Sequence, residues 1–122
     1  MRKGMAVALL ALAGALPMAA GATTVAAAPG APAANEVAMT IVIKDHKFTP
    51  AELKVPAGKT IVLTIDNRDS TPEEFDSPDL KIEKVVPGGT TAKVRFGPLK
   101  AGSFAFVGEF NQKTARGVVK VE

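Results

Sequence analysis

Apolar and polar residues alternate with a period of two along much of the chain after residue 37. Between residues 60 and 66, Ile61, Leu63 and Ile65 fall on one side of an extended chain, and Val62, Thr64 and Asp66 fall on the other. Side chains of a β-strand point alternately to its two faces, so this pattern predicts a half-buried strand. Six further segments show alternation or a short apolar run: 38–45, 53–55, 80–86, 91–97, 103–108 and 117–122.

Turn-forming residues separate these segments, as in Pro56-Ala57-Gly58 and Pro87-Gly88-Gly89. About seven short strands with turn signals between them, and no helical period, predict an all-β sandwich or barrel without helices. The six Phe residues are expected to anchor the core, since a fully buried Phe contributes about 2–3 kcal/mol. Phe75 is expected to close one end of that core.

The segment between the third and fourth long strands is strongly acidic. Residues 66–83 contain seven Asp or Glu and two Lys or Arg. The Asn, Asp, Ser and Pro residues of 67–72 favour turns, so the acidic segment is expected to be a loop, with Glu73 and Asp79 in solvent.

The first 36 residues have a different composition. Arg2 and Lys3 precede an apolar run of about twelve residues and then small residues, which is the order found in a secretory signal. This run is shorter than the roughly 20 residues that span a bilayer. We expect a signal peptide at 1–22, with cleavage as late as residue 28, an Ala/Pro-rich linker at 23–36, one domain at 37–122, and a periplasmic or secreted protein.

Charge and composition exclude several functions. Of the 15 Lys and Arg residues two lie in the leader, so the rest carries 13 against 12 Asp and Glu, which does not favour nucleic acid as a partner. There is no Cys, one His and, beyond the leader, one Met, so a type 1 copper site built from two His and a Cys is impossible within this chain. No motif for a nucleophilic hydrolase is present, and any enzymatic activity stays open.

Carboxylates are the remaining candidate metal ligands. Glu74 and Glu109 each precede a Phe, and Glu83 lies in the strand after the acidic segment. Loops gather at the ends of a sandwich, so these side chains can converge and repel one another unless a cation, a basic side chain or a shared proton intervenes. The alternatives are a metal site and an ion-pair network with Lys84, Lys113 and Arg116. His46 is either an exposed turn residue or a further ligand.

The strings "FTPAELKVPAGKTIVLTIDN", "EEFDS", "EKVVPGGT", "KAGSFAF" and "GVVKVE" occur in this order between residues 48 and 122. In this respect the chain resembles the cupredoxin-like family, and in particular the EfeO-type domains that accompany bacterial ferrous-iron permeases. The resemblance implies a Greek-key β-sandwich and a periplasmic protein that binds, or helps to oxidise, iron with or without copper. It places the metal ligands at Glu74, Glu83, Glu109 and His46. It also implies a histidine at the position where this chain has Asn111.

The sequence therefore predicts a cupredoxin-like metal-handling protein that is accessory to iron uptake, with an iron or copper ion as its cofactor and no type 1 copper. Its expected partners are an inner-membrane iron permease and other periplasmic iron-uptake proteins. The alternative is an Ig-like sandwich without a metal, whose acidic segment docks a periplasmic or membrane partner.

Overall fold

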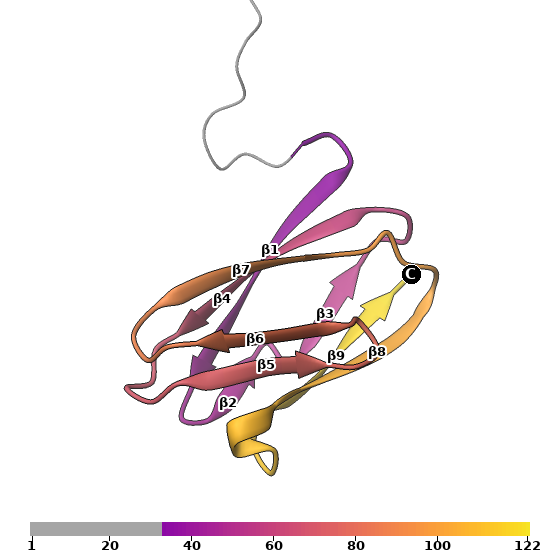
Figure 1. Cartoon of the computed structure of the whole chain (residues 1–122). Helices are drawn as coiled ribbons and strands as arrows, with labels where there is room; N and C mark the ends of the chain where they lie inside the picture. Colours follow the sequence, from indigo (N-terminus) through magenta and orange to yellow (C-terminus); the bar gives the residue numbers. More distant parts are fainter. Residues whose placement is uncertain (1–32) are drawn as a thin grey trace, which may run out of the picture.

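Two β-sheets packed face to face form the domain in a computed structural model that describes residues 33–122 (Figure 1). The predicted signal peptide and most of the predicted linker lie outside the described residues. The described chain contains nine strands and one short 3-10 turn: β1 (Glu36–Lys44), β2 (Lys47–Thr49), β3 (Glu52–Val55), β4 (Thr60–Asn67), β5 (Glu73–Ser77), β6 (Ile82–Val86), β7 (Thr91–Phe96), β8 (Gly102–Gly108), η1 (Glu109–Asn111) and β9 (Arg116–Val121).

The strand order shows that the chain passes between the sheets. One sheet has the order β2-β1-β4-β7 and the other has the order β3-β9-β8-β5-β6. Two pairs are parallel, β1 with β4 and β3 with β9, and the remaining pairs are antiparallel. Parallel neighbours cannot be joined by a tight hairpin, so these pairs require connections that cross the sandwich. The prediction of an all-β sandwich is confirmed, with nine strands where about seven were expected.

The inward faces of both sheets form one apolar core. Ile61, Leu63 and Ile65 of β4 are at most 1% exposed, as their alternation predicts. Across β8 and β9, Phe104 lies opposite Val119, and Gly102 lies opposite Val121. The strands thus bury the faces that the period of two assigned to the interior.

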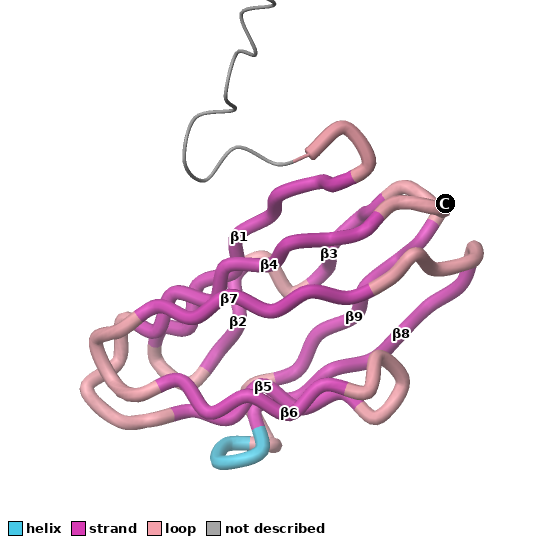
Figure 2. The backbone as a smooth tube through the Cα atoms, turned by 45° about the horizontal axis from the view of Figure 1, so that its top comes forward, coloured by secondary structure: helices cyan, strands magenta, loops and turns pink. Residues whose placement is uncertain are grey.

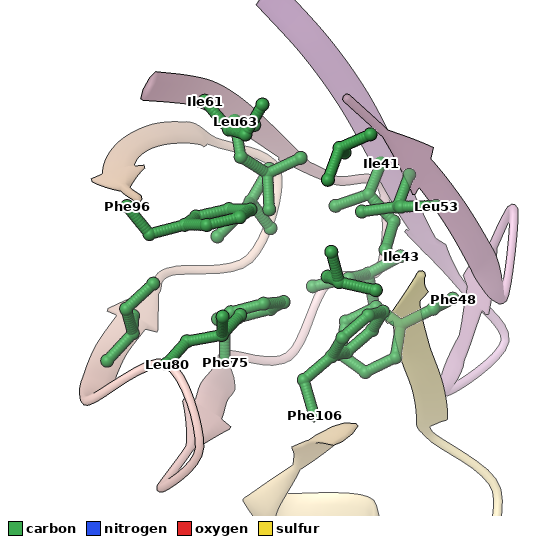
Figure 3. Packing of buried hydrophobic residues seen from close by; sticks show 14 of the residues in the cluster. Ile41, Ile43, Phe48, Leu53, Ile61, Leu63, Phe75, Leu80, Phe96 and Phe106 are labelled. Atoms are coloured by element: carbon green, nitrogen blue, oxygen red, sulfur yellow. The ribbon is translucent and has the colours of Figure 1, made fainter. Parts of the chain in front are cut away.

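Three Phe rings fill the centre of this core (Figure 3). Phe75 and Phe106 stack with ring centroids 4.9 Å apart, and the Phe48 ring meets them edge-on at 5.9 Å and 5.1 Å. Stacked and edge-on arrangements bring the ring quadrupoles into favourable orientations, which adds stability to that from burying the apolar area of the rings. The expectation that all six Phe residues anchor the core is wrong for Phe110, which is 51% exposed.

The acidic segment is not wholly a loop. Residues 73–77 form β5, which lies between β6 and β8 in the second sheet. Its side chains alternate between buried and half-buried, with Glu73, Phe75 and Ser77 inside. The alternation of buried and exposed positions could not be recognised in the sequence, because Glu73 occupies a buried position and Glu is rarely a core residue.

The turn η1 extends beyond the end of β8 (Figure 2), where the sequence predicted no helical residues. It has three residues, too few for a helical period to appear in the sequence. Among residues 33–122, no helix is long and apolar enough to cross a membrane.

Replacing Phe75 by Ala is expected to lower the free energy of unfolding by about 3–5 kcal/mol, because it removes a fully buried ring and leaves a cavity. The matched change Phe110→Ala is expected to stay within about 0.5 kcal/mol of the wild type. Urea titration followed by circular dichroism measures both, since the chain has no Trp or Tyr to report by fluorescence. Equal losses in the two variants would contradict this assignment of the core.

Candidate functional site

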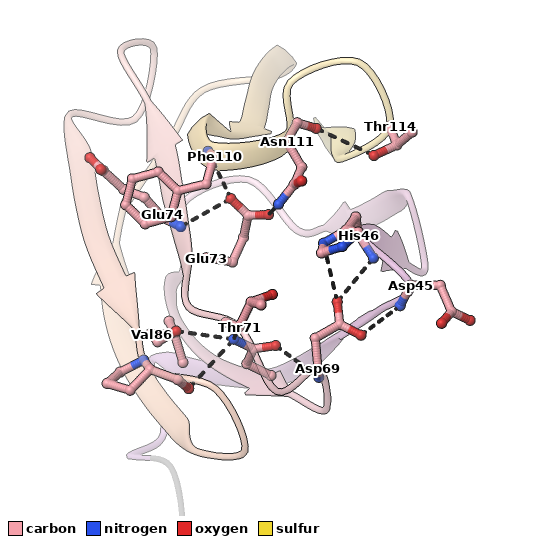
Figure 4. A network of polar contacts seen from close by, with 12 residues as sticks. Asp45, His46, Asp69, Thr71, Glu73, Glu74, Val86, Phe110, Asn111 and Thr114 are labelled. Carbon is pink, nitrogen blue, oxygen red and sulfur yellow. Dashed lines mark hydrogen bonds and ion pairs between the residues drawn. The ribbon is translucent and has the colours of Figure 1, made fainter.

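A buried carboxylate holds the turn η1 against β5 (Figure 4). Glu73 is 1% exposed. Its Oε1 accepts the backbone N–H groups of Phe110 at 3.0 Å and Glu74 at 3.1 Å, and its Oε2 accepts the side-chain amide of Asn111 at 2.6 Å. A buried carboxylate needs such donors, because its desolvation is otherwise strongly unfavourable. The expectation that Glu73 lies in solvent is therefore wrong.

Gly108 makes the space for this carboxylate. A Cβ at residue 108 would lie 2.7 Å from Cδ of Glu73 and 2.6 Å from Cβ of Ala115, closer than non-bonded carbons approach. The backbone N–H of Gly108 donates to the carbonyl of Ala115 at 2.8 Å, and the N–H of Ala115 donates to the carbonyl of Asn111 at 2.8 Å. The loop 108–115 is thus closed by its own backbone on one side and by Glu73 on the other.

The role of Asn111 follows from the same contacts. Its amide Nδ2 is a donor to a buried carboxylate, an interaction that joins η1 to β5. Hydrogen bonds to a charged group are the stronger ones in proteins. Asn111 is therefore a structural residue of this loop, since its side-chain amide donates to the carboxylate that joins η1 to β5.

Four carboxylates lie on the outward side of β5, β6 and η1, and we call Glu74, Asp76, Glu83 and Glu109 the acidic face. Glu74 and Asp76 occupy the half-buried positions of β5 that alternate with its core residues. Asp76 lies directly opposite Glu83 of β6 in the strand register, and Glu109 begins η1. Cβ atoms of directly opposite residues are about 4.5–5.5 Å apart in antiparallel strands.

Repulsion within the acidic face is visible at Glu109. The charge of Glu74 raises the pKa of Glu109 above its usual value, and partial desolvation and the nearby carboxylates of Asp76 and Glu83 raise it further. The structure therefore brings three of the predicted ligands, Glu74, Glu83 and Glu109, within electrostatic reach of one another. The sequence analysis missed Asp76, although its spacing of two from Glu74 already put both on one face of an extended chain.

The acidic face lacks the basic partners that the alternative interpretation requires. In the described part of the chain, the ion pairs join His46 to Asp69, Arg68 to Asp66, Arg95 to Glu36 and Lys120 to Glu52. None of the residues 33–122 forms an ion pair with a carboxylate of the acidic face. Equally, no group of three or more His, Cys, Asp or Glu among these residues is arranged as a ready metal site.

His46 lies at the same end of the sandwich but in a different environment. Its backbone N–H and that of Asp45 donate to the carboxylate of Asp69 at 2.9 Å and 2.8 Å, and both residues have positive φ. The hydrogen bond from the His46 backbone is the main cause that lowers the pKa of Asp69. His46 also lines an open depression together with residues 109–114. Its imidazole thus borders the same loop as Glu109, whereas Glu74 and Glu83 do not line that depression.

Replacing Asn111 tests the bond to Glu73. Asn111→Ala removes a donor to a buried carboxylate and is expected to lower the free energy of unfolding by about 1.5–3 kcal/mol. At pH 8 Asn111→Asp is expected to cost on the order of 1 kcal/mol more, because two carboxylates then face each other where the amide stood. This difference in unfolding free energy between the Asp and Ala variants should be smaller at pH 5, where the two carboxyl groups of the Asp variant can share a proton. Urea titrations at both pH values measure it, and an Asp variant as stable as the Ala variant at pH 8 would contradict the contact.

The raised pKa of Glu109 predicts a pH effect of defined sign. A carboxyl with a raised pKa binds its proton more tightly in the folded than in the unfolded state, so its ionisation disfavours folding as the pH rises through the folded pKa. Glu74→Gln is expected to lower the pKa of Glu109 toward its usual value, and added salt should act in the same direction because the site is exposed. Carboxyl NMR titration measures the shift, with Glu52→Gln as the control. An unchanged titration of Glu109 in Glu74→Gln would refute the proposed coupling.

Comparison with known proteins agrees with this architecture. The profile of the cupredoxin-like domain family matches residues 10–121. The Uncharacterized protein RP394 of Rickettsia prowazekii (strain Madrid E) is 42% identical over 87 residues, which cover 71% of this chain and 70% of that protein.

Solved structures of low sequence identity share the fold. Auracyanin A, a "blue" copper protein from Chloroflexus aurantiacus, is 17% identical with a TM-score of 0.62, covering 71% of this chain and 99% of that one. The metal-binding domain of the Cu(I)-exporting ATPase CopA from Streptococcus pneumoniae is 16% identical with a TM-score of 0.63, covering 75% and 91%. From the family match, the Rickettsia relative and the nine-stranded sandwich, the chain belongs to the cupredoxin-like domain family.

Proposed function

We propose that this protein is an exported, periplasmic cupredoxin-like module that handles iron or copper ions in support of iron uptake, with no type 1 copper site. The observation that carries the proposal is the acidic face. Four carboxylates share it, the other three raise the pKa of Glu109, and no basic residue of the described chain forms an ion pair with any of them.

A metal cation would relieve this repulsion. Two like charges that lie close together repel each other, and a cation placed between them attracts both. Carboxylate oxygens suit harder ions such as Fe(III) and Mn(II). Soft ligands that select Cu(I) are scarce, because the chain has no Cys and Met39 is the one Met after the leader. Glu74, Glu83 and Glu109 are the proposed ligands, with Asp76 beside them. His46 is the proposed additional ligand, and its approach would require movement of the 45–46 turn or of η1.

The open arrangement of the acidic face favours transient binding of a metal ion. Its carboxylates lie on the outside of two strands and a short turn, and no ready cage of three ligands exists in residues 33–122. A site that assembles around the ion releases it more easily than a rigid, buried cage. Such a site suits the delivery of an ion to another protein better than its permanent retention as a cofactor.

The cellular setting is part of the proposal. The signal-like residues 1–22 support export, and the resemblance to EfeO-type domains supports an inner-membrane iron permease and other periplasmic iron-uptake proteins as partners. If the module assists Fe(II) oxidation, a bound Cu(II) would accept the one electron that Fe(II) gives up and would itself become Cu(I). The copper-binding proteins with the same fold are compatible with this, although their low identity limits the likeness to the fold.

Isothermal titration calorimetry of the exported protein with anaerobic Fe(II), Cu(II) and Mn(II) tests the proposal. We expect binding of at least one of these ions, with affinity that falls about tenfold or more in Glu74→Gln and in Glu109→Gln, a loss of about 1.4 kcal/mol. Affinity should also fall as the pH is lowered through the raised pKa of Glu109, because protons compete with the metal.

Glu52→Gln is the matched control, since Glu52 is an exposed carboxylate on β3 that pairs with Lys120 at 3.4 Å. This variant should bind the ion as the wild type does. Absence of heat with all three ions, or unchanged binding in both acidic-face variants, would eliminate the proposed site.

A further inference from the structure

Two exposed apolar side chains border the acidic face. Val85 is 50% exposed and Phe110 is 51% exposed, and they are the exposed large hydrophobic residues of the described chain. Val85 lies opposite Glu74 in the pairing of β5 with β6. Phe110 directly follows Glu109, and its backbone N–H shares Oε1 of Glu73 with the N–H of Glu74 (Figure 4). Val85 is therefore the cross-strand neighbour of Glu74, and the backbone of Phe110 is held by the same carboxylate oxygen of Glu73 as the backbone of Glu74.

We propose that this surface docks a protein partner that presents an apolar side chain surrounded by Lys or Arg. The docking face consists of the acidic face together with Val85 and Phe110. Aromatic anchors ringed by polar groups are typical of protein interfaces. The proposal goes beyond metal handling and does not require a bound ion, because it depends on the apolar pair and on the charge.

The charge decides which occupant fits. A second copy of the chain, docked face to face, would bring two sets of four unpaired carboxylates together, which disfavours a symmetric dimer at this surface. Anionic lipid is disfavoured for the same reason. A basic protein surface supplies the cations that residues 33–122 do not provide here.

The distribution of charge over the chain also supports orientation of such a partner. Residues 66–83 hold seven of the 12 acidic residues. Of these, Glu73 is buried and Asp66 and Asp69 pair with Arg68 and His46, whereas Glu74, Asp76 and Glu83 lie without such partners on the acidic face. A basic partner is attracted to this part and repelled from the more basic remainder, which raises the rate of productive encounters.

The backbone of Phe110 is held in place by hydrogen bonds, although its ring is exposed. The bond from its N–H to Glu73, together with the neighbouring bond from Asn111, holds η1 in place while the Phe110 ring stays exposed. An anchor on a fixed backbone loses little conformational entropy on binding. The two apolar residues make a small patch, so the docking is expected to be weak and reversible.

Two synthetic peptides of equal charge serve as probes. One has two lysines at each end and a Leu-Phe-Leu centre, and the other has a serine centre. Both are titrated at low salt, with a chelator present to exclude metal effects, into the isotopically labelled exported protein. The backbone amide NMR signals are followed. We expect the apolar peptide to shift the amides of 74–76, 83–85 and 107–110 and to bind at least about fivefold more tightly than the serine peptide.

Variants separate the apolar contribution from the charge. Val85→Ser combined with Phe110→Ser should remove the advantage of the apolar peptide, whereas Glu74→Gln combined with Asp76→Asn should weaken both peptides. Equal binding of the two peptides by the wild type, or shifts spread over other surfaces, would overturn the docking face. The double Ser variant should bind metal as the wild type does. A wild-type protein that prefers the apolar peptide but binds none of the metal ions would count against the proposed function alone.

Discussion

The buried carboxylate of Glu73 is the interaction on which this end of the protein depends. An isolated carboxylate in a protein interior is strongly unfavourable, so the fold supplies three neutral donors, two from the backbone and one from Asn111. These donors come from β5 and from η1, which are far apart in the sequence. The carboxylate thereby joins β5, the strand between β8 and the edge strand β6, to the loop that follows β8.

This one contact determines the position of the residues around it. Gly108 has to be glycine because a Cβ would collide with the Glu73 carboxylate and with Ala115. Since β5 alternates, holding Glu73 inside turns Glu74 and Asp76 outward, beside Glu83 and next to Glu109. The acidic face and the exposed Phe110 are both consequences of how Glu73 is satisfied. Like charges without neutralising partners disfavour folding, and proteins tend to keep such local conflicts at functional sites.

Sequence reasoning succeeded where the interior is apolar. The alternation in 60–66 identified the inward residues of β4, and the apolar runs near the end of the chain identified the core side of β8 and β9. It failed at β5, because a Glu at an inward position interrupts the apolar pattern that marks a buried strand. Sequence reasoning also placed Phe110 in the core. The presence of a Phe in a loop does not by itself say whether its ring is buried or exposed.

The amino-acid sequence by itself determined the class of fold and the chemistry that is available. The period of two specifies strands, and the absence of Cys with a single His excludes a type 1 copper centre, because both follow from residue identity and local spacing. Only the tertiary structure decided what the carboxylates do. Whether a Glu is buried or exposed, paired or unpaired, depends on which distant donors and charges the strand order brings to it. A glutamate therefore serves as a buried hydrogen-bond acceptor at residue 73 and as a surface carboxylate without an ion-pair partner at residue 74.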